Sequence, residues 1–472
     1  MKRVKDTFDE RAAALDGLLG VGRSFDMIGR TLRIGGRRAR LWVVNGYADD
    51  TVLERAISAW LPIPSLEDVG TLQAFADRYV SVCDAAVETD RLKAVTSVFA
   101  GKTLLIIDGF SGGVVLDAKQ FPLRSVEEPD TSKVLRGSHD GFGESVMKNA
   151  ALLRRRIRDS QLTLESLQVG TRSRTDVVLC YMENRVDTEL LNRIRTRIQK
   201  VHVDALSMNQ ESLAECIYPH KWFNPFPKFR FSERPDTSAA SILEGNIIIL
   251  VDNSPSAMIL PSSVFDIIEE ADDYYFPPLT GTYLRLSRTV IFFLTLFLTP
   301  LWLLFMQNPG WIPEWLAFIR VTDEIHVALI YQLLILEFAI DGLRLAAVNT
   351  PSMLTTPLSV IAGIVLGEYS VKSGWFNSET MLYMAFVTIA NYSMTSFELG
   401  YALKFMRVLL LILTFFLNLW GFIAGTLIAV GCLVFNRTIA GKSYIYPLIP
   451  FHWSELKKRL LRNRLPHEEK NG

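Results

Sequence analysis

The hydrophobic and polar positions divide this chain into two parts built for different solvents. Up to about residue 287 apolar and charged residues are mixed along the chain. From Thr289 to about Phe435 the chain is dominated by Leu, Ile, Phe, Val and Ala, with few charges between them. Long uncharged apolar runs are typical of membrane-spanning helices. The pattern therefore predicts a soluble region followed by a membrane region.

The first 284 residues have the pattern of an α/β protein. Short apolar runs rich in β-branched residues, typical of strands, alternate with segments of helical spacing. A glycine-rich turn at residues 109–113 and a second turn at residues 253–255 predict hairpins. We expect two α/β subdomains, residues 1–128 and 129–284. The predicted strands are residues 39–45, 103–107, 114–117, 163–169, 177–182, 247–251 and 257–260, and the predicted helices are residues 51–60, 71–82, 91–99, 142–157, 188–198 and 237–243.

Residues 285–436 predict an α-helical membrane domain of four or five spans, followed by a basic tail, residues 437–472. The run at residues 289–306 is uncharged and long enough to cross a hydrocarbon core of about 30 Å. Pro300 lies inside it, which neighbouring helices can accommodate. The other candidate spans are residues 327–343, 358–371, 381–399 and 408–435.

The positions of basic residues indicate on which side of the membrane the ends of these spans lie. Clusters before the first span, before the last span and after it all favour the cytoplasmic side. Five simple crossings cannot satisfy all three clusters. Either the short, glycine-interrupted segment 358–371 is re-entrant, which we favour, or the last run folds back near Asn418 and Gly421. The sequence leaves both alternatives open.

Composition excludes several classes of partner and ligand for this protein. The chain carries 50 Lys and Arg against 50 Asp and Glu, so it lacks the basic field of a nucleic-acid reader. The four cysteines and six histidines are scattered, which predicts no disulfide framework, no metal site and no cofactor. The first 20 residues are charged and lack the apolar core of a secretory signal, so we expect the polar part in the cytoplasm.

Two motifs of catalytic type lack the context that catalysis needs. Gly109-Phe-Ser-Gly-Gly113 matches a nucleophile elbow, but a strand rather than a helix is predicted after Ser111. The segment Ala100-Gly-Lys-Thr103 resembles the end of a phosphate loop, yet it too precedes a strand. We therefore predict that the protein is not an enzyme and has no catalytic residues.

Ionisable residues within the apolar region are candidate functional groups. Glu337 and Asp341 lie one helical turn apart, followed by Arg344, and Glu368 and Glu398 lie at the ends of later runs. Such residues either pair between helices or line an aqueous path, and we hold both interpretations open. The short segment around Glu368 has the character of a pore-lining element, with small residues and an apolar constriction. Its candidate pore or gate residues are Val360, Gly363, Ile364, Val365, Gly367 and Glu368.

A second candidate set lies in the soluble region, where charge and glycine are unusually dense. We interpret it mainly as a subdomain or subunit interface, in which arginines pair with carboxylates, rather than as a catalytic site. Its members are Glu128, Asp130, Arg136, Arg154, Arg155, Arg156, Glu233, Arg234 and Asp236.

Several of these blocks together resemble the GerA family of bacterial spore germination proteins, A-subunit type. The resemblance extends from about residue 22 to about residue 450. It rests on Val134-Leu-Arg-Gly-Ser138, Leu152-Leu-Arg-Arg-Arg-Ile157, Glu233-Arg-Pro-Asp236 and Ile247-Ile-Ile-Leu-Val-Asp252. Within the family, Gln332-Leu-Leu-Ile-Leu-Glu337, Ile340-Asp-Gly-Leu-Arg-Leu-Ala346, Glu398-Leu399 and Tyr446-Pro-Leu-Ile-Pro-Phe451 look closest to the stage V sporulation branch.

The resemblance implies a multi-pass protein of the spore inner membrane, with its N-terminal domain facing the spore core. It implies a homo-oligomer, pentameric in the family, around a pore for monovalent cations, working with other spore germination membrane proteins. The alternative function is a non-conducting scaffold or signalling subunit of a germinant receptor complex. In either case the lipid bilayer is a partner and nucleic acid is not.

Overall fold

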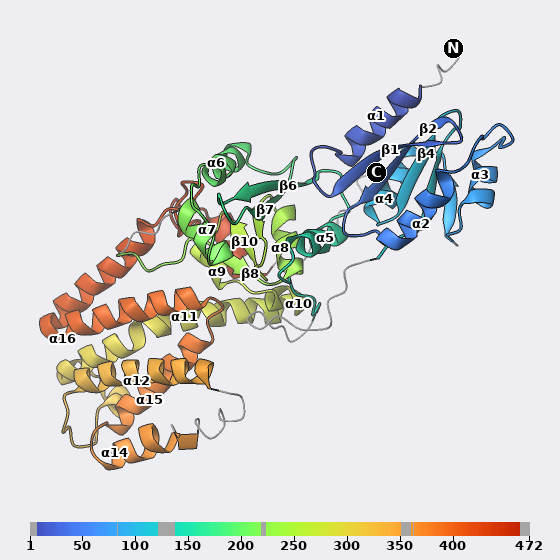
Figure 1. Ribbon diagram of the computed structural model, residues 1–472. Coiled ribbons are helices and arrows are strands. Elements are labelled where there is room, and N and C mark those ends of the chain that lie inside the picture. The colour runs from blue at the N-terminus through green and yellow to red at the C-terminus, as the bar shows by residue number, and fades with distance from the viewer. Residues whose placement is uncertain are drawn as a thin grey trace. The chain divides into compact units, whose positions relative to one another are not determined.

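The computed structural model describes residues 7–82, 84–120, 137–218, 223–350, 360–361 and 363–462. The chain forms two compact units. The first, here called the α/β unit, comprises residues 1–219 and 229–261. The second, the helical unit, comprises residues 220–228 and 262–472. Figure 1 shows the sheets of the first unit and the long helices of the second.

The α/β unit contains two five-stranded antiparallel sheets with the same topology. The strand orders are β1-β2-β4-β5-β3 and β6-β7-β9-β10-β8, so each strand of one sheet has a counterpart in the other. The strands of the first sheet are β1 (Met27–Ile34), β2 (Arg37–Val44), β3 (Ala85–Glu88), β4 (Thr103–Ile107) and β5 (Gly113–Leu116). Those of the second are β6 (Leu162–Val169), β7 (Thr175–Met182), β8 (Arg230–Ser232), β9 (Ile247–Val251) and β10 (Ala257–Leu260).

The helices of the two sheets also follow one order. One helix precedes each sheet, two follow its second strand, and one follows its third. The helices are α1 (Phe8–Leu19), α2 (Asp50–Trp60), α3 (Leu72–Tyr79) and α4 (Arg91–Phe99) for the first sheet, and α5 (Val146–Arg156), α6 (Thr188–Gln199), α7 (Asn209–Ile217) and α8 (Pro235–Leu243) for the second. The α/β unit therefore consists of two subdomains of the same design, although the sequence shows no repeat.

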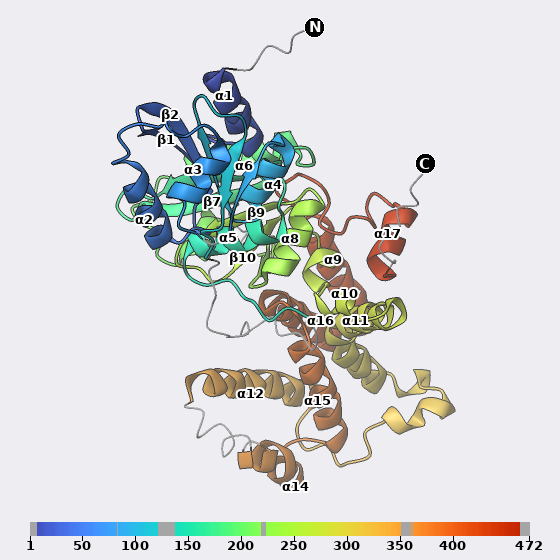
Figure 2. The ribbon, with the colours of Figure 1, turned by 90° about the vertical axis from the view of Figure 1, so that its right-hand side faces the viewer.

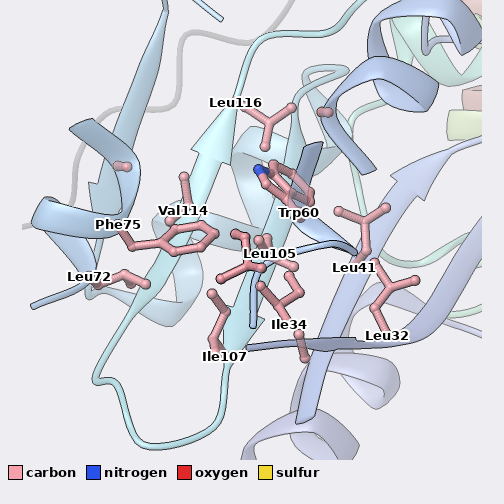
Figure 3. Close-up of a cluster of buried hydrophobic side chains, with 14 of the residues drawn as sticks. Leu32, Ile34, Leu41, Trp60, Leu72, Phe75, Leu105, Ile107, Val114 and Leu116 are labelled. Carbon is pink, nitrogen blue, oxygen red and sulfur yellow. The ribbon is translucent and has the colours of Figure 1, made fainter. Parts of the chain in front are cut away.

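Alternation along the strands explains the layered packing. On β4 every side chain is buried, because successive residues point to opposite faces that are both covered. Leu105 and Ile107 pack against α2 and α3, and Figure 3 shows them beside Trp60 and Phe75. Leu104 and Ile106 pack on the other face against α1 and α4. Every strand and helix predicted for this unit is present, with ends that differ by at most four residues.

The helical unit contains two helices long and apolar enough to cross a membrane, α11 (Pro278–Gln307) and α16 (Phe397–Val434). This judgement rests on length and composition and suggests membrane association. The predicted span 289–306 is the apolar part of α11, whose polar first turns extend the helix by eleven residues. The other elements are α9 (Val264–Ile268), α10 (Asp272–Tyr275), η1 (Pro309–Trp311), η2 (Glu314–Ile319), α12 (Leu329–Asn349), η3 (Gly363–Tyr369), α14 (Ser370–Lys372), α15 (Ser378–Tyr392) and α17 (Trp453–Leu460).

Helix α16 folds back on itself at Asn418, which leaves the helical region with φ 51° and ψ −130°. Beyond this residue Gly421 lies against the backbone of Leu413, and Gly425 lies against Leu410. A side chain at Gly421 would collide with the backbone of the first arm, so the reversal requires glycine there, and one at Gly425 would make a tight contact with Leu410. The last apolar run is thus a hairpin of two helical arms, visible in Figure 1. This was one of the two alternatives; the other, a re-entrant segment 358–371, stays a prediction.

The predicted span 381–399 is wrong in its bounds. Helix α15 ends at Tyr392, and α16 begins at Phe397 with Ser396 as its N-cap, whose hydroxyl accepts from the Leu399 backbone N–H. Polar residues between the two helices supply the capping that a continuous apolar span would not need.

Candidate functional site in the helical unit

Four charged side chains from two helices form a cluster in the interior of the helical unit. The Arg407 guanidinium on α16 donates to both carboxylate oxygens of Glu337 on α12, at 2.6 Å and 2.9 Å. Lys404, one turn earlier, forms an ion pair with Asp341 and donates to the Glu337 backbone carbonyl at 2.9 Å. Arg407, Glu337 and Lys404 are all buried, whereas Asp341 is about one-third exposed.

This ion-pair cluster lies within the apolar length of α11 and not at its end. Arg407 also donates to the backbone carbonyl of Thr295 at 2.7 Å. Thr295 is seven residues beyond Arg288, which is about 10 Å along a helix. The C-terminal end of α11 meets the tip of the α16 hairpin, where the Asn308 side-chain amide donates to that of Asn418 at 2.6 Å. The cluster therefore lies at a level of α11 between Arg288, before the apolar run, and Asn308, at the end of the helix.

Lys404 and Arg407, the two basic members of this cluster, are predicted from the sequence as flanking cations on the cytoplasmic side. In the structure both are buried and paired with carboxylates. The positive-inside tendency applies to flanking charges in short loops, not to bases neutralised inside a bundle. Acids four residues apart on one helix and bases three apart on another were the available signal.

The two other intramembrane candidates have different surroundings. The Arg344 guanidinium lies over the rings of Tyr392, Phe397 and Tyr401, about 5 Å from each centroid. Glu398 is exposed in the first turn of α16, where a carboxylate is favoured by the helix dipole. Of the four predicted residues, Glu337 and Asp341 come together in the ion-pair cluster.

The six predicted pore or gate residues lie on one short helical segment, described here at residues 360–361 and 363–372. It includes a π-helical stretch, η3, in which Ser370 caps the Val365 carbonyl at 2.7 Å. Val360, Ile364 and Val365 expose 42–56% of their surfaces. A Cβ atom at Gly363 or Gly367 would meet none of the described atoms within 4 Å. Within the described part of this chain, the apolar face of the segment is uncovered.

Glu368 at the end of this segment is exposed and pairs with Lys372 one turn later, at 2.6 Å. A surface pair of this kind contributes little stability. Both side chains are therefore available to contacts from outside the chain at small cost.

The predicted interface residues of the α/β unit divide into three groups. Arg154 is fully buried and joins the two subdomains, since it donates to Asp26 at 2.8 Å and to Ser24 at 3.0 Å. Its guanidinium also lies over the ring of Phe99. This is a subdomain interface, although Asp26 rather than the predicted acids supplies the partner carboxylate.

The second group converges on the segment before α5. Arg156 pairs with Asp140 and donates to the Ser138 hydroxyl at 3.0 Å, while Arg234 pairs with Asp236 and donates to the Ser138 carbonyl at 2.9 Å. In the third group, Arg155 is exposed on α5, and the Glu233 backbone carbonyl accepts from the Phe142 backbone N–H. Glu128, Asp130 and Arg136 lie outside the described residues.

The serine of the elbow-like motif lies in a turn between antiparallel strands. Ser111 separates β4 from β5, and Gly109 and Gly112 adopt φ values of 85° and 89° that favour glycine. A nucleophile elbow needs a helix after the serine, and β5 follows instead. The turn borders an open cleft of about 510 Å³ together with Arg11 and Asp90. Across the described residues, no group of three or more His, Cys, Asp or Glu is placed to hold a metal ion.

Comparison with known proteins places these features in context. The profile described as "Bacillus/Clostridium GerA spore germination protein" matches residues 15–471. Stage V sporulation protein AF of Bacillus subtilis is 34% identical over 452 residues, which cover 95% of this chain and 91% of that protein. Spore germination protein KA of the same organism is 25% identical, over 94% of this chain and 82% of that protein.

One solved structure is also similar. It is the crystal structure of the N-terminal domain of the A subunit of the Bacillus megaterium spore germinant receptor GerK3. The match has 24% sequence identity and a TM-score of 0.42, and covers 55% of this chain and 96% of that domain.

Proposed function

Because the chain belongs to the GerA family of spore germination proteins, we propose that it is a membrane subunit of the germination machinery that forms a gated channel with further copies of itself. The channel releases monovalent cations during germination. It works in the spore inner membrane with other germination membrane proteins, and its α/β unit faces the spore core. The ring is five-fold, as the family resemblance implies.

The uncovered face of the 360–369 segment is the observation that carries this proposal. Val360, Ile364 and Val365 expose large apolar surfaces on a segment too short for an ordinary span. Segments of this kind occur at membrane depth where they line a cavity or pack against protein. Repetition of the segment around an axis encloses a pore with an apolar constriction, which closes by dewetting. Gly363 and Gly367 leave room for the neighbouring copies to approach.

In this proposal the ion-pair cluster holds the frame in which the segment sits. Glu337 and Arg407 fix α12 against α16, and Arg407 also ties both helices to α11. Charges that are paired and buried do not offer a site to a passing cation. Ion conduction therefore depends on the 360–369 segment and not on Glu337 or Asp341.

A non-conducting scaffold is the second candidate, and one observation favours it. Three carboxylates of the membrane region are neutralised within the chain: Glu337 by Arg407, Asp341 by Lys404 and Glu368 by Lys372. Carboxylates that serve only to join helices need no aqueous path. The scaffold predicts that neither Val365→Ala nor Glu368→Gln alters ion release.

Cation efflux from liposomes separates the two candidates. The full chain is reconstituted into potassium-loaded vesicles, and the efflux of Val365→Ala is compared with that of Val290→Ala, an equally exposed valine on α11. The channel predicts faster resting efflux for Val365→Ala, because the constriction is less apolar and wider. Val290→Ala is expected to behave like the parent protein. Equal efflux from all three proteins and from empty vesicles would favour the scaffold.

A further inference from the structure

The loop that joins α16 to α17 exposes an unusual number of large apolar side chains. Leu448, Ile449, Phe451 and Trp453 have 42%, 46%, 63% and 64% of their surfaces exposed within six residues. None of them belongs to either helix that is long and apolar enough to span a membrane. In water such a contiguous patch marks an interaction site or an aggregation hazard. We call residues 446–453 the aromatic loop.

Contacts at the C-terminal end of α17, the helix that follows this loop, fix the level of that end along α11. The Arg462 backbone N–H donates to the Thr282 hydroxyl at 3.1 Å, and the Arg285 guanidinium donates to the Arg459 carbonyl at 3.4 Å. Thr282 and Arg285 lie in the polar turns before the apolar run of α11 begins at Thr289. Helix α17 is therefore level with the polar entrance to the span. Figure 2 shows α17, in red, near the labelled start of α11.

A cavity of about 230 Å³ places Leu448 of the aromatic loop further along α11, beyond its polar first turns. Leu448 lines it together with Phe292 and Phe293 of α11 and Val430 of α16. These residues belong to the first apolar turns beyond Arg288 and to the returning arm of the hairpin. At Leu448 the aromatic loop thus lies beside the first apolar turns of α11, and the helix that follows the loop ends at the polar entrance. That depth is the boundary between headgroups and acyl chains, where Trp and other aromatic residues are enriched.

Charge next to the loop agrees with a lipid surface. Lys457 is exposed on α17, whereas the Arg462 guanidinium, just beyond the end of this helix, donates to the Tyr274 backbone carbonyl at 2.6 Å. Arg459 is instead neutralised by Asp266 and Glu269, so it anchors the helix to the protein. A basic residue held near an anionic leaflet is attracted to its headgroups. An exposed cation beside exposed aromatic rings fits anionic headgroups above an apolar layer.

We propose that the aromatic loop and α17 form an interfacial membrane element, which inserts its four apolar side chains into the adjacent leaflet of an anionic bilayer. The inference rests on the membrane placement of the proposed function, but not on channel activity. The element binds the leaflet without crossing it, as amphipathic interfacial segments do. It holds the start of α11 and the end of the α16 hairpin at one depth, because α17 contacts the first and Leu448 the second.

Depth-dependent quenching tests the proposal in the full chain. The four native cysteines are replaced, and an environment-sensitive fluorophore is attached at Ser454→Cys, which leaves all four apolar side chains in place, and in a second protein at Trp453→Cys. The proteins are reconstituted in phosphatidylcholine and phosphatidylglycerol vesicles with a nitroxide near the top of the acyl chain. Matched labels go to Leu294, on the apolar part of α11, and to Met208, which is exposed in the α/β unit.

The proposal predicts that fluorophores at positions 453 and 454 have blue-shifted emission and are quenched by the shallow nitroxide. The fluorophore at position 208 is expected to show no quenching. If 294 is quenched while 453 and 454 behave like 208, the aromatic loop is in water and the proposal is overturned, although the span stands. If 294 is also unquenched, the membrane placement of α11 fails, and the proposal fails with it.

Discussion

At the scale of single residues, the ion pair between Arg407 and Glu337 is a buried polar contact between α16 and α12 of the helical unit. A buried pair costs much desolvation free energy, which its mutual attraction only just offsets. Removing one partner leaves the other charge buried and uncompensated. The pair therefore fixes which helix faces meet, rather than adding much to the net stability.

Glu337→Gln is expected to lower the free energy of unfolding of the helical unit by about 3–5 kcal/mol, because Arg407 loses its counter-charge. The matched control Glu368→Gln breaks an exposed pair and is expected to change it by less than about 1 kcal/mol. Thermal unfolding in one detergent measures both. A Glu337→Leu, Arg407→Leu double variant should recover part of the loss. Equal transitions for both single variants would mean that the Glu337 pair is not buried.

Cysteine reactivity tests the α/β unit at the same scale. Burial in β7 raises the pKa of the Cys180 thiol far above its usual value, and the nearby Asp26 carboxylate raises it further. Cys216 on α7 is exposed, although its pKa is also raised. A raised pKa means less thiolate at a given pH, and burial also denies access. Iodoacetamide at mildly alkaline pH should label Cys216 and spare Cys180 until denaturant is added, as read by peptide mass spectrometry. Labelling of Cys180 in the native protein would contradict the buried central strand.

At the scale of elements, the sequence predicted the central strands and six of the eight described helices of the α/β unit, but not α1 or α7. The central strands β4 and β9 are buried at every position and read as continuous apolar runs. Edge strand β1 was missed, because its burial is irregular and Arg30 and Arg33 interrupt it. Strands β3 and β8 were missed because they are short edge strands whose pairing depends on a distant partner. The two sheets have the same topology, but their sequences show no repeat that would have predicted it.

The reversal of α16 could be anticipated only as one of two alternatives. Hydropathy reports that residues 408–435 are apolar, but a straight helix and a hairpin bury similar surfaces. The deciding features are local: a positive φ at Asn418 and the close approach of Gly421 to the first arm. Likewise, nothing in the sequence alone pairs Asn308 with Asn418 across more than a hundred residues.

Gly421→Ala tests this hairpin. The added Cβ would lie 1.8 Å from the Leu413 carbonyl oxygen. The backbone could relieve this clash only if the two arms moved apart. We expect loss of the folded, monodisperse protein in detergent, or a strongly lowered melting temperature. Gly431→Ala, on the same helix, meets only Phe435 at 3.9 Å and should be neutral or more stable by up to about 1 kcal/mol. A Gly421→Ala protein as stable as Gly431→Ala would contradict the fold-back.

At the scale of the whole molecule, the two units have separate tasks. In the α/β unit the buried Arg154 of one subdomain contacts Asp26 and Ser24 of the other. The helical unit combines a neutralised charge cluster with an apolar segment that the described chain leaves uncovered. The length and glycines of that segment identify it in the sequence, and several short motifs identify the family of the chain. The sequence could not identify the partners of Glu337, because they lie 67 and 70 residues away.

The central claim is that the pore is made between copies of this chain and not within one. The native mass of the detergent-purified full chain, with particle images of the same sample, tests it most directly. The account predicts a closed ring of several copies, five-fold if the family resemblance holds, with the 360–369 segments toward the axis. A monomer or dimer that persists across several detergents would contradict it, because no ring would remain to enclose a pore.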